Sequence, residues 1–193
     1  MSSLWLILSW ITYFALHSIL ALTSVKNFAY SAGMAPHRYR LIYNILAFVL
    51  LIPIMIVSSR TQSSYLFEPS VLFKFLGLML ATWGLIIAKI AFRSYDTKAF
   101  LGLGKLEAES RLSTGGMLKH VRHPLYSGSI LIVLGYFLFD PKVSTLISTS
   151  MIITYIIIGI QLEERKLIRS FGQAYLDYKR KTPMLIPRFW RKP

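Results

Sequence analysis

The sequence predicts an all-α integral membrane protein with five transmembrane helices. Its 193 residues are 54% hydrophobic and only 16% charged, and the mean hydropathy is +0.53. This composition excludes a soluble two-domain enzyme and a disordered chain, because neither carries so many residues able to be buried. The apolar residues form five runs near the roughly 20-residue length that crosses a bilayer: Leu4–Leu22, Leu41–Val57, Val71–Phe92, Leu125–Phe139 and Val143–Leu162.

The first and the last two runs carry further information. Leu4–Leu22 is long and is not preceded by basic residues, so we expect it to remain as a membrane span and not to act as a cleaved signal. The fourth run is short for a span. Only residues 140–142 separate it from the fifth run, and such a short link allows only a tight turn. The two runs are therefore predicted to form an antiparallel helical hairpin.

The basic residues indicate an orientation. Of the 22 lysines and arginines, three lie between the first two runs, six between the third and fourth, and nine after the fifth, whereas the opposite side has three. The positive-inside rule then places the N-terminus outside and both the loop 93–122 and the tail from residue 163 in the cytoplasm. The net charge of +14 is thus expected at an anionic membrane face, and no nucleic-acid partner is expected.

The cytoplasmic tail is predicted to contain an amphipathic helix. Large apolar and aromatic residues recur in it at spacings of four, four and three, which is one face of a helix: Leu167, Phe171, Tyr175 and Tyr178. Two positions are open for this helix, either as a cap on the bundle or in the headgroup plane. The end of the chain, with Phe189–Trp190, is predicted to be an extended segment anchored at the interface.

Two polar clusters stand at the ends of the predicted hairpin. The run 119–128 has two imidazoles, a guanidinium and a phenol, and Pro124 suits the first helical turn. The second cluster, Glu163 to Lys166, follows the fifth run. Because the hairpin places the start of one helix beside the end of the other, we expect the clusters to be neighbours. Carboxylates at a helix C-terminus oppose its dipole, so Arg122, Arg165 or a ligand should compensate them.

The other polar residues have weaker patterns. His120 and His123 have no cysteine and no clear third ligand beside them, so no metal site is expected. His17 in the first run is expected to be a hydrogen-bonded core residue, and Tyr43 and Asn44 in the second run to bridge helices. The absence of cysteine also excludes disulfides and cysteine nucleophiles.

Two motifs resemble those of a known superfamily. The run K-H-V-R-H-P-L-Y-S-G at 119–128 resembles the R-H-P-x-Y-x-G signature of membrane methyltransferases of the isoprenylcysteine carboxyl methyltransferase and phospholipid methyltransferase type. Residues 162–187 resemble the E-E-x-x-L, F-G-x-x-Y-x-x-Y and terminal proline pattern of that superfamily. Several upstream residues resemble its bacterial branch of methanethiol S-methyltransferases and NnrU-type proteins, which implies a bacterial plasma membrane: His17-Ser18, Lys26, Arg38 to Tyr43, and 100–103.

The resemblance implies one methyltransferase domain over residues 1–193, with a three-span part at 1–94 and a cofactor-binding part at 95–193. It further implies S-adenosylmethionine as the cofactor, in a cytoplasmic pocket that opens toward the bilayer. The acceptor would be a small thiol such as methanethiol or an isoprenylcysteine-like carboxylate. Matching positions imply the following cofactor contacts: His120, Arg122, His123, Pro124, Tyr126, Gly128, Glu163 and Glu164.

The catalytic residues implied by the same resemblance are His123, Glu164 and Arg165. A thiol acceptor would need a base such as a histidine, whereas a carboxylate acceptor would need only an arginine to orient it. Two other functions are open: a membrane reductase of the sterol type that uses NADPH, and a non-catalytic NnrU-like membrane factor. The short chain and the pair of glutamates favour the methyltransferase, and the sequence indicates no particular protein partner.

Overall fold

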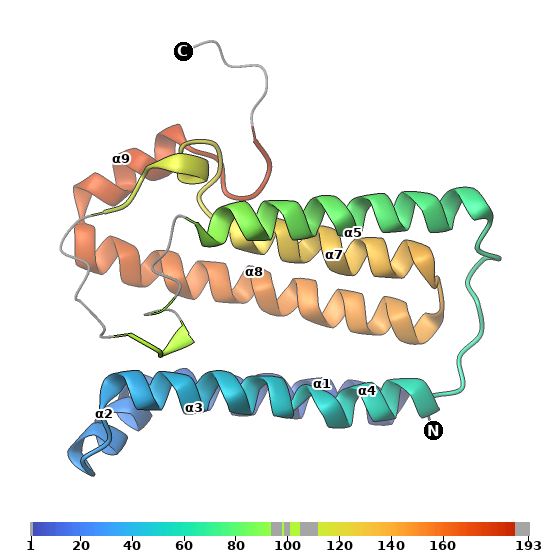
Figure 1. The fold of residues 1–193 in the computed structure, drawn as a ribbon, viewed down its shortest axis with the longest axis horizontal. Helices are drawn as coiled ribbons and strands as arrows, with labels where there is room; N and C mark the ends of the chain where they lie inside the picture. The colour runs from blue at the N-terminus through green and yellow to red at the C-terminus, as the bar shows by residue number, and fades with distance from the viewer. Residues whose placement is uncertain (1, 94–97, 99–100, 105–111, 188–193) are drawn as a thin grey trace. The chain divides into compact units, whose positions relative to one another are not determined.

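The computed structural model describes residues 2–93, 98, 101–104 and 112–187. The described residues are helical with connecting turns (Figure 1). Phe100 and the predicted interfacial anchor Phe189–Trp190 lie outside the described residues. The helices are α1 (Ser3–Ala21), α2 (Thr23–Ser31), α3 (Pro36–Val49), α4 (Leu51–Arg60), α5 (Val71–Phe92), the 3-10 turn η1 (Gly116–Lys119), α7 (Pro124–Phe139), α8 (Val143–Phe171) and α9 (Gln173–Lys181).

Four stretches of helix are long and apolar enough to cross a membrane: Ser3–Ala21, Pro36–Arg60, Val71–Phe92 and Val143–Phe171. The fourth predicted span is the shorter apolar helix α7 of 16 residues, which at 1.5 Å per residue is about 24 Å long. Many large apolar side chains on the long helices are exposed, as Phe48 (72%) and Leu85 (61%) illustrate. Apolar surface of this extent is suited to contact with lipid.

The second span is a bent helix that begins earlier than its apolar run. Pro36 occupies the first helical turn of α3, where the missing N–H of proline has no cost. The helix is interrupted at Leu50, between Val49 and Leu51. The cause is Pro53, whose ring collides with the carbonyl four residues earlier, that of Val49.

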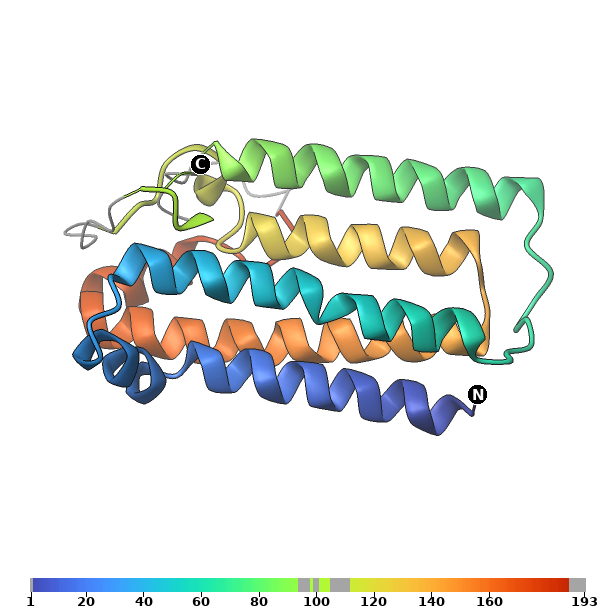
Figure 2. The same cartoon turned by 60° about the horizontal axis from the view of Figure 1, so that its bottom comes forward.

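The described part of the chain divides into two compact units. The first contains residues 1–67, 96–108 and 142–151. In it, α3 and α4 follow each other along α1 (Figure 2). The indole Nε1 of Trp10 donates a hydrogen bond of 3.0 Å to Ser148 Oγ, and the Tyr43 hydroxyl lies 2.6 Å from Nε2 of His17. The predicted role of Tyr43 as a bridge between helices is confirmed.

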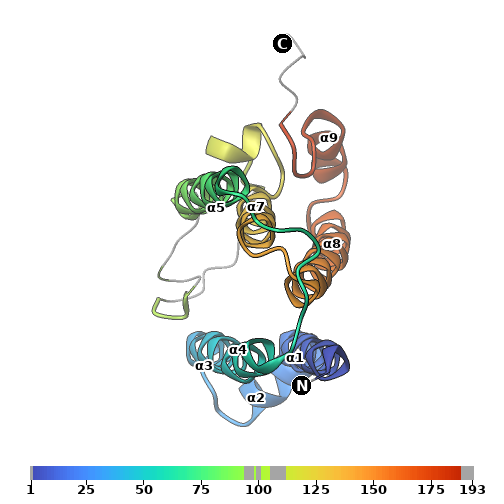
Figure 3. The ribbon, with the colours of Figure 1, turned by 90° about the vertical axis from the view of Figure 1, so that its right-hand side faces the viewer.

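The second unit contains residues 68–95, 109–141 and 152–193. Its α5 and α7 run antiparallel, side by side (Figure 3). The contact is made by glycines seven residues apart: Gly77 and Gly84 of α5 face Gly135 and Gly128 of α7. A Cβ at Gly84 would lie 2.6 Å from the carbonyl oxygen of Gly128, so the two backbones touch and leave no room for a methyl group.

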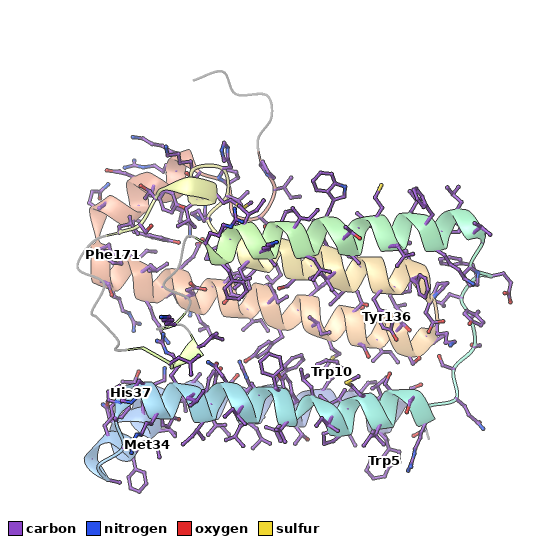
Figure 4. All side chains as sticks on the ribbon, viewed as in Figure 1. Trp5, Trp10, Met34, His37, Tyr136 and Phe171 are labelled. Carbon is purple, nitrogen blue, oxygen red and sulfur yellow. The ribbon has the colours of Figure 1, made fainter. Side chains whose placement is uncertain are left out.

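The tail contains a C-terminal helix as predicted, but the prediction that Leu167, Phe171, Tyr175 and Tyr178 share one helix is wrong. Helix α8 continues past Leu162 and ends at Phe171 (Figure 4). At Gly172 the backbone takes a φ of +54°, a conformation that favours glycine, and a separate helix, α9, begins after it. The hydroxyl of Tyr178 on α9 donates to the carbonyl of Leu118 in η1 at 2.7 Å. This contact agrees with the capping alternative, in which the tail folds back on its own unit.

Candidate functional site

The two polar clusters meet through an ion pair. Nη2 of Arg122, just before α7, lies 2.7 Å from Oε1 of Glu164 on α8, and Nε of Arg122 donates to the same oxygen at 2.8 Å. Each side chain is only 7% exposed. The predicted proximity of the clusters is confirmed, and so is the compensation of a carboxylate by Arg122. Because α8 continues to Phe171, however, Glu164 lies within a helix and not at its end.

His123 joins the same carboxylate. Its Nε2 lies 3.3 Å from Oε1 of Glu164, and its imidazole is 4% exposed. An ionised carboxylate can only accept hydrogen bonds, so the proton of a neutral ring belongs on Nε2. The other ring nitrogen, Nδ1, faces Oε2 of Glu163 at 3.9 Å. In the neutral ring, Glu164 therefore sets the tautomer, and the lone pair of Nδ1 lies on the side of Glu163.

A third group on Glu164 comes from α9. Nζ of Lys179 lies 2.6 Å from Oε2 of Glu164, so both carboxylate oxygens have protein partners. Lys179 was not predicted as a site residue, because a continuous tail helix would have carried it away from α7. Only the reversal of the chain at Gly172 brings it back. Gly172, three residues before Tyr175 and within the helical pattern of the tail, was the available signal.

The proline segment that follows α9 is hydrogen-bonded along the start of α7. The backbone N–H groups of Arg122 and His123 donate to the carbonyls of Pro183 and Met184, at 2.9 and 3.1 Å. The guanidinium of Arg122 also donates to the carbonyl of Thr182. N–H groups that precede a helix lack helical acceptors, and this segment supplies them. Arg122 thus ties three parts of the second unit together.

The remaining residues of the predicted cofactor site lie around this centre. The Tyr126 ring is 5.6 Å from the imidazole of His123, and Pro124 is buried in the first turn of α7. Gly128 lies against Gly84 of α5, where its missing side chain permits the helix contact. His120 is exposed.

The charged residues on either side of Glu164 in the sequence are accessible to solvent. Arg165 is exposed, and the Glu163 side chain is 46% exposed. Within the described ranges, the structure has no group of three or more histidine, aspartate or glutamate side chains arranged to hold a metal ion.

Tyr175 was not predicted as a site residue, although it belongs to the aromatic pattern of the tail. It is 1% exposed and lies near the charged cluster. Burial, followed by the charge of Glu164, raises the pKa of its phenol. The phenol is therefore neutral, and its hydroxyl can both donate and accept a hydrogen bond.

The comparison with protein families decides which family these residues belong to. The family model described as phospholipid methyltransferase matches residues 72–174, which is more than half of the chain. The chain belongs to this family. Membership of the phospholipid methyltransferase family confirms the superfamily that the motifs at 119–128 and 162–187 resemble. The match includes α5, α7 and the whole of α8, and with them Arg122, His123 and Glu164.

Individual relatives within the superfamily have named activities. A methanethiol S-methyltransferase of Crocosphaera subtropica is 38% identical over 84 residues, which is 42% of this chain and 31% of that protein. Methanethiol S-methyltransferase 1 of Bradyrhizobium diazoefficiens is 39% identical over 92 residues, 47% of this chain and 30% of that protein.

A more distant relative acts on a different acceptor. The protein-S-isoprenylcysteine O-methyltransferase of Schizosaccharomyces pombe is 34% identical over 84 residues, 43% of this chain and 36% of that protein. The chain thus matches about a third of the length of each of these relatives. No solved structure matches it significantly.

Proposed function

We propose that this protein is a membrane methyltransferase that uses S-adenosylmethionine and acts on a small thiol such as methanethiol, or on a lipophilic acceptor such as an isoprenylcysteine-like carboxylate. The observation that carries the proposal is the buried cluster of Arg122, His123 and Glu164 in a chain of the phospholipid methyltransferase family. The relatives named as methanethiol S-methyltransferases favour the thiol.

The chemistry of the site fits this cofactor. S-adenosylmethionine carries a sulfonium and an ammonium group, and the half-exposed carboxylate of Glu163 attracts cations in a partly dry site. The ring of Tyr126 offers a face for a cation–π contact. The resemblance adds His120, Arg122, Pro124 and Gly128 to the residues that would hold the cofactor. When bound, the cofactor supplies an activated methyl group, and most of the rate then comes from positioning.

Glu164 has a positioning role in this proposal. Both of its oxygens already have protein partners, so direct contact with the cofactor falls mainly to Glu163. Glu164 holds the guanidinium of Arg122 and the Nε2 proton of His123. Because Glu164 already holds these two side chains in place, they lose little conformational entropy when substrate binds.

His123 and Arg165 serve the acceptor. For a thiol, Nδ1 of His123 takes the proton, and the Glu163 carboxylate, with an oxygen 3.9 Å away, stabilises the imidazolium that forms. For a carboxylate acceptor no base is needed. The exposed guanidinium of Arg165 then orients the substrate by a two-point contact.

Replacing His123 by Gln tests the base. The Gln amide keeps a donor for Glu164 but has no basic nitrogen. The rate of thiol methylation at neutral pH should fall by about 100-fold or more, a larger factor than the accompanying loss of cofactor affinity. The rate of the variant should recover as the pH rises toward the pKa of the thiol, because solution then supplies the thiolate. Initial rates between pH 6 and pH 10 measure this, and an equally low rate across that range would contradict the role of Nδ1.

The proposal includes five spans, with α7 as the fourth, in a bacterial plasma membrane and in a single domain over residues 1–193. The N-terminus would lie outside, and the site and C-terminus in the cytoplasm. Since the chain has no cysteine, single cysteines report the topology directly. In intact cells an impermeant maleimide should label Gln62→Cys and should not label Ser113→Cys until the cells are lysed. Labelling of both, or of Ser113→Cys alone, would contradict this orientation.

The activity itself is tested with purified protein and methyl-labelled S-adenosylmethionine. Methanethiol, a prenylcysteine analogue and phosphatidylethanolamine are supplied in turn, and labelled product is measured. We expect transfer to a thiol or to the prenylcysteine analogue. Calorimetry with S-adenosylmethionine and with NADPH accompanies the assay. Binding of NADPH without binding of S-adenosylmethionine would replace the proposal by a reductase, and binding of neither would favour a non-catalytic role.

A further inference from the structure

The hydroxyl of Tyr175 is a buried polar group without a protein partner. The residue is 1% exposed, and among the residues that the structure describes its hydroxyl finds no hydrogen-bond partner. Leaving a buried hydroxyl unpaired costs free energy, and native structures rarely leave such a group unpaired without a reason.

Tyr178, on the same helix, has a hydroxyl with a clear structural role. The rings of Tyr175 and Tyr178 are 5.9 Å apart. The Tyr178 hydroxyl donates to the carbonyl of Leu118 at 2.7 Å, so its hydrogen bond holds α9 to η1. The ring of Tyr175 alone would fill the space under α9 just as well if it were a phenylalanine. Within the described residues, the oxygen of Tyr175 makes no such hydrogen bond.

The surroundings of this hydroxyl carry both signs of charge. Glu164, Arg122 and Glu163 all act on it electrostatically, and the Arg122 guanidinium lies close enough to favour the phenolate as a donor, but it makes no hydrogen bond of ordinary geometry to the hydroxyl. Arg122 and Glu164 are paired with each other, whereas Glu163 is open to the surface. A neutral phenol in this setting suits a ligand that has both an ammonium donor and a carboxylate acceptor.

We propose that the Tyr175 hydroxyl is a cofactor-binding group that hydrogen-bonds the amino-acid end of S-adenosylmethionine. This inference rests on the proposed function and extends it to a residue beyond the matched region 72–174. In the absence of cofactor the hydroxyl is unsatisfied, and cofactor binding satisfies it. Helix α9 is then part of the binding site as well as a cap on the second unit.

The pair of variants Tyr175→Phe and Tyr178→Phe tests the inference, because both remove one hydroxyl from α9. Tyr175→Phe should raise the Tm of the cofactor-free protein by a few degrees, since it removes a buried unsatisfied group. It should also weaken S-adenosylmethionine binding about three- to tenfold. Tyr178→Phe should lower the Tm and leave the affinity unchanged. Thermal unfolding in detergent and titration calorimetry supply the two readouts.

Two further ligands locate the contact. S-adenosylhomocysteine retains the amino-acid end, so Tyr175→Phe should weaken its binding by the same factor. 5′-Methylthioadenosine lacks that end, so its affinity should not change. Equal affinity of wild type and Tyr175→Phe for S-adenosylmethionine, or an equal loss for methylthioadenosine, would overturn the inference while leaving the proposed function intact. A wild-type protein that binds none of the three would overturn both.

Discussion

Replacing Glu164 by Gln is expected to abolish methyl transfer and to weaken S-adenosylmethionine binding at least tenfold. The neutral amide cannot balance Arg122, which is 7% exposed, or fix the Nε2 proton of His123 as the carboxylate does. Breaking a buried ion pair on one side leaves the other charge buried and costs about 3–5 kcal/mol. The free energy of unfolding should fall accordingly, because Arg122 also donates to the carbonyls of Lys179 in α9 and of Thr182 after it.

The matched control is Glu163→Gln, which removes the same charge from the adjacent residue. The Glu163 side chain is 46% exposed, so its loss should leave the Tm nearly unchanged while cofactor affinity falls. Both variants are compared by thermal unfolding, and by calorimetry at a temperature where each is folded by circular dichroism. Wild-type affinity in folded Glu164→Gln would show that the Arg122–Glu164 pair does not position the cofactor site. Wild-type affinity in both variants would show that the site is elsewhere.

Replacing Gly84 by Ala is expected to destabilise the second unit strongly. The new Cβ would lie 2.6 Å from the carbonyl oxygen of Gly128 and 2.9 Å from the backbone nitrogen of Ile132. Backbone atoms in a helix cannot turn aside as a flexible side chain can, so α5 and α7 would have to separate. Overpacking of this kind costs about 1–3 kcal/mol or more. The start of α7 carries Arg122 and His123, so cofactor affinity should fall as well.

Gly159→Ala makes the same chemical change on α8, at a position where the added methyl group meets no neighbouring atom. Within the described residues, no atom from outside its own helix turn lies within 4 Å of a Cβ built at Gly159. Alanine is the better helix former by about 1 kcal/mol, so this variant should be at least as stable as the wild type. Thermal unfolding in detergent compares the two. Equal Tm values for both variants would contradict the close contact between α5 and α7.

Much of the architecture could be predicted because its signals are local. Span 71–92 has the predicted bounds, and α7 begins one residue before the predicted Leu125. The three-residue link at 140–142 was sufficient to predict the neighbourhood of Arg122 and Glu164. Errors arose where the pattern continued across a break. The spacing of Leu167, Phe171 and Tyr175 was helical throughout, yet one glycine with a positive φ divides it into two helices.

The sequence by itself determined where apolar helices form and which charged clusters lie at their ends. Both depend only on the length of each apolar run and on the length of the link between consecutive runs. Tertiary structure alone decided that Lys179 takes the second oxygen of Glu164 and that the glycines of α5 and α7 face each other. It also decided that the Tyr175 hydroxyl has no hydrogen-bond partner among the residues that the structure describes. These contacts join segments whose approach depends on a backbone reversal and on close packing of helix surfaces. Neither is encoded in the spacing of residues within one segment.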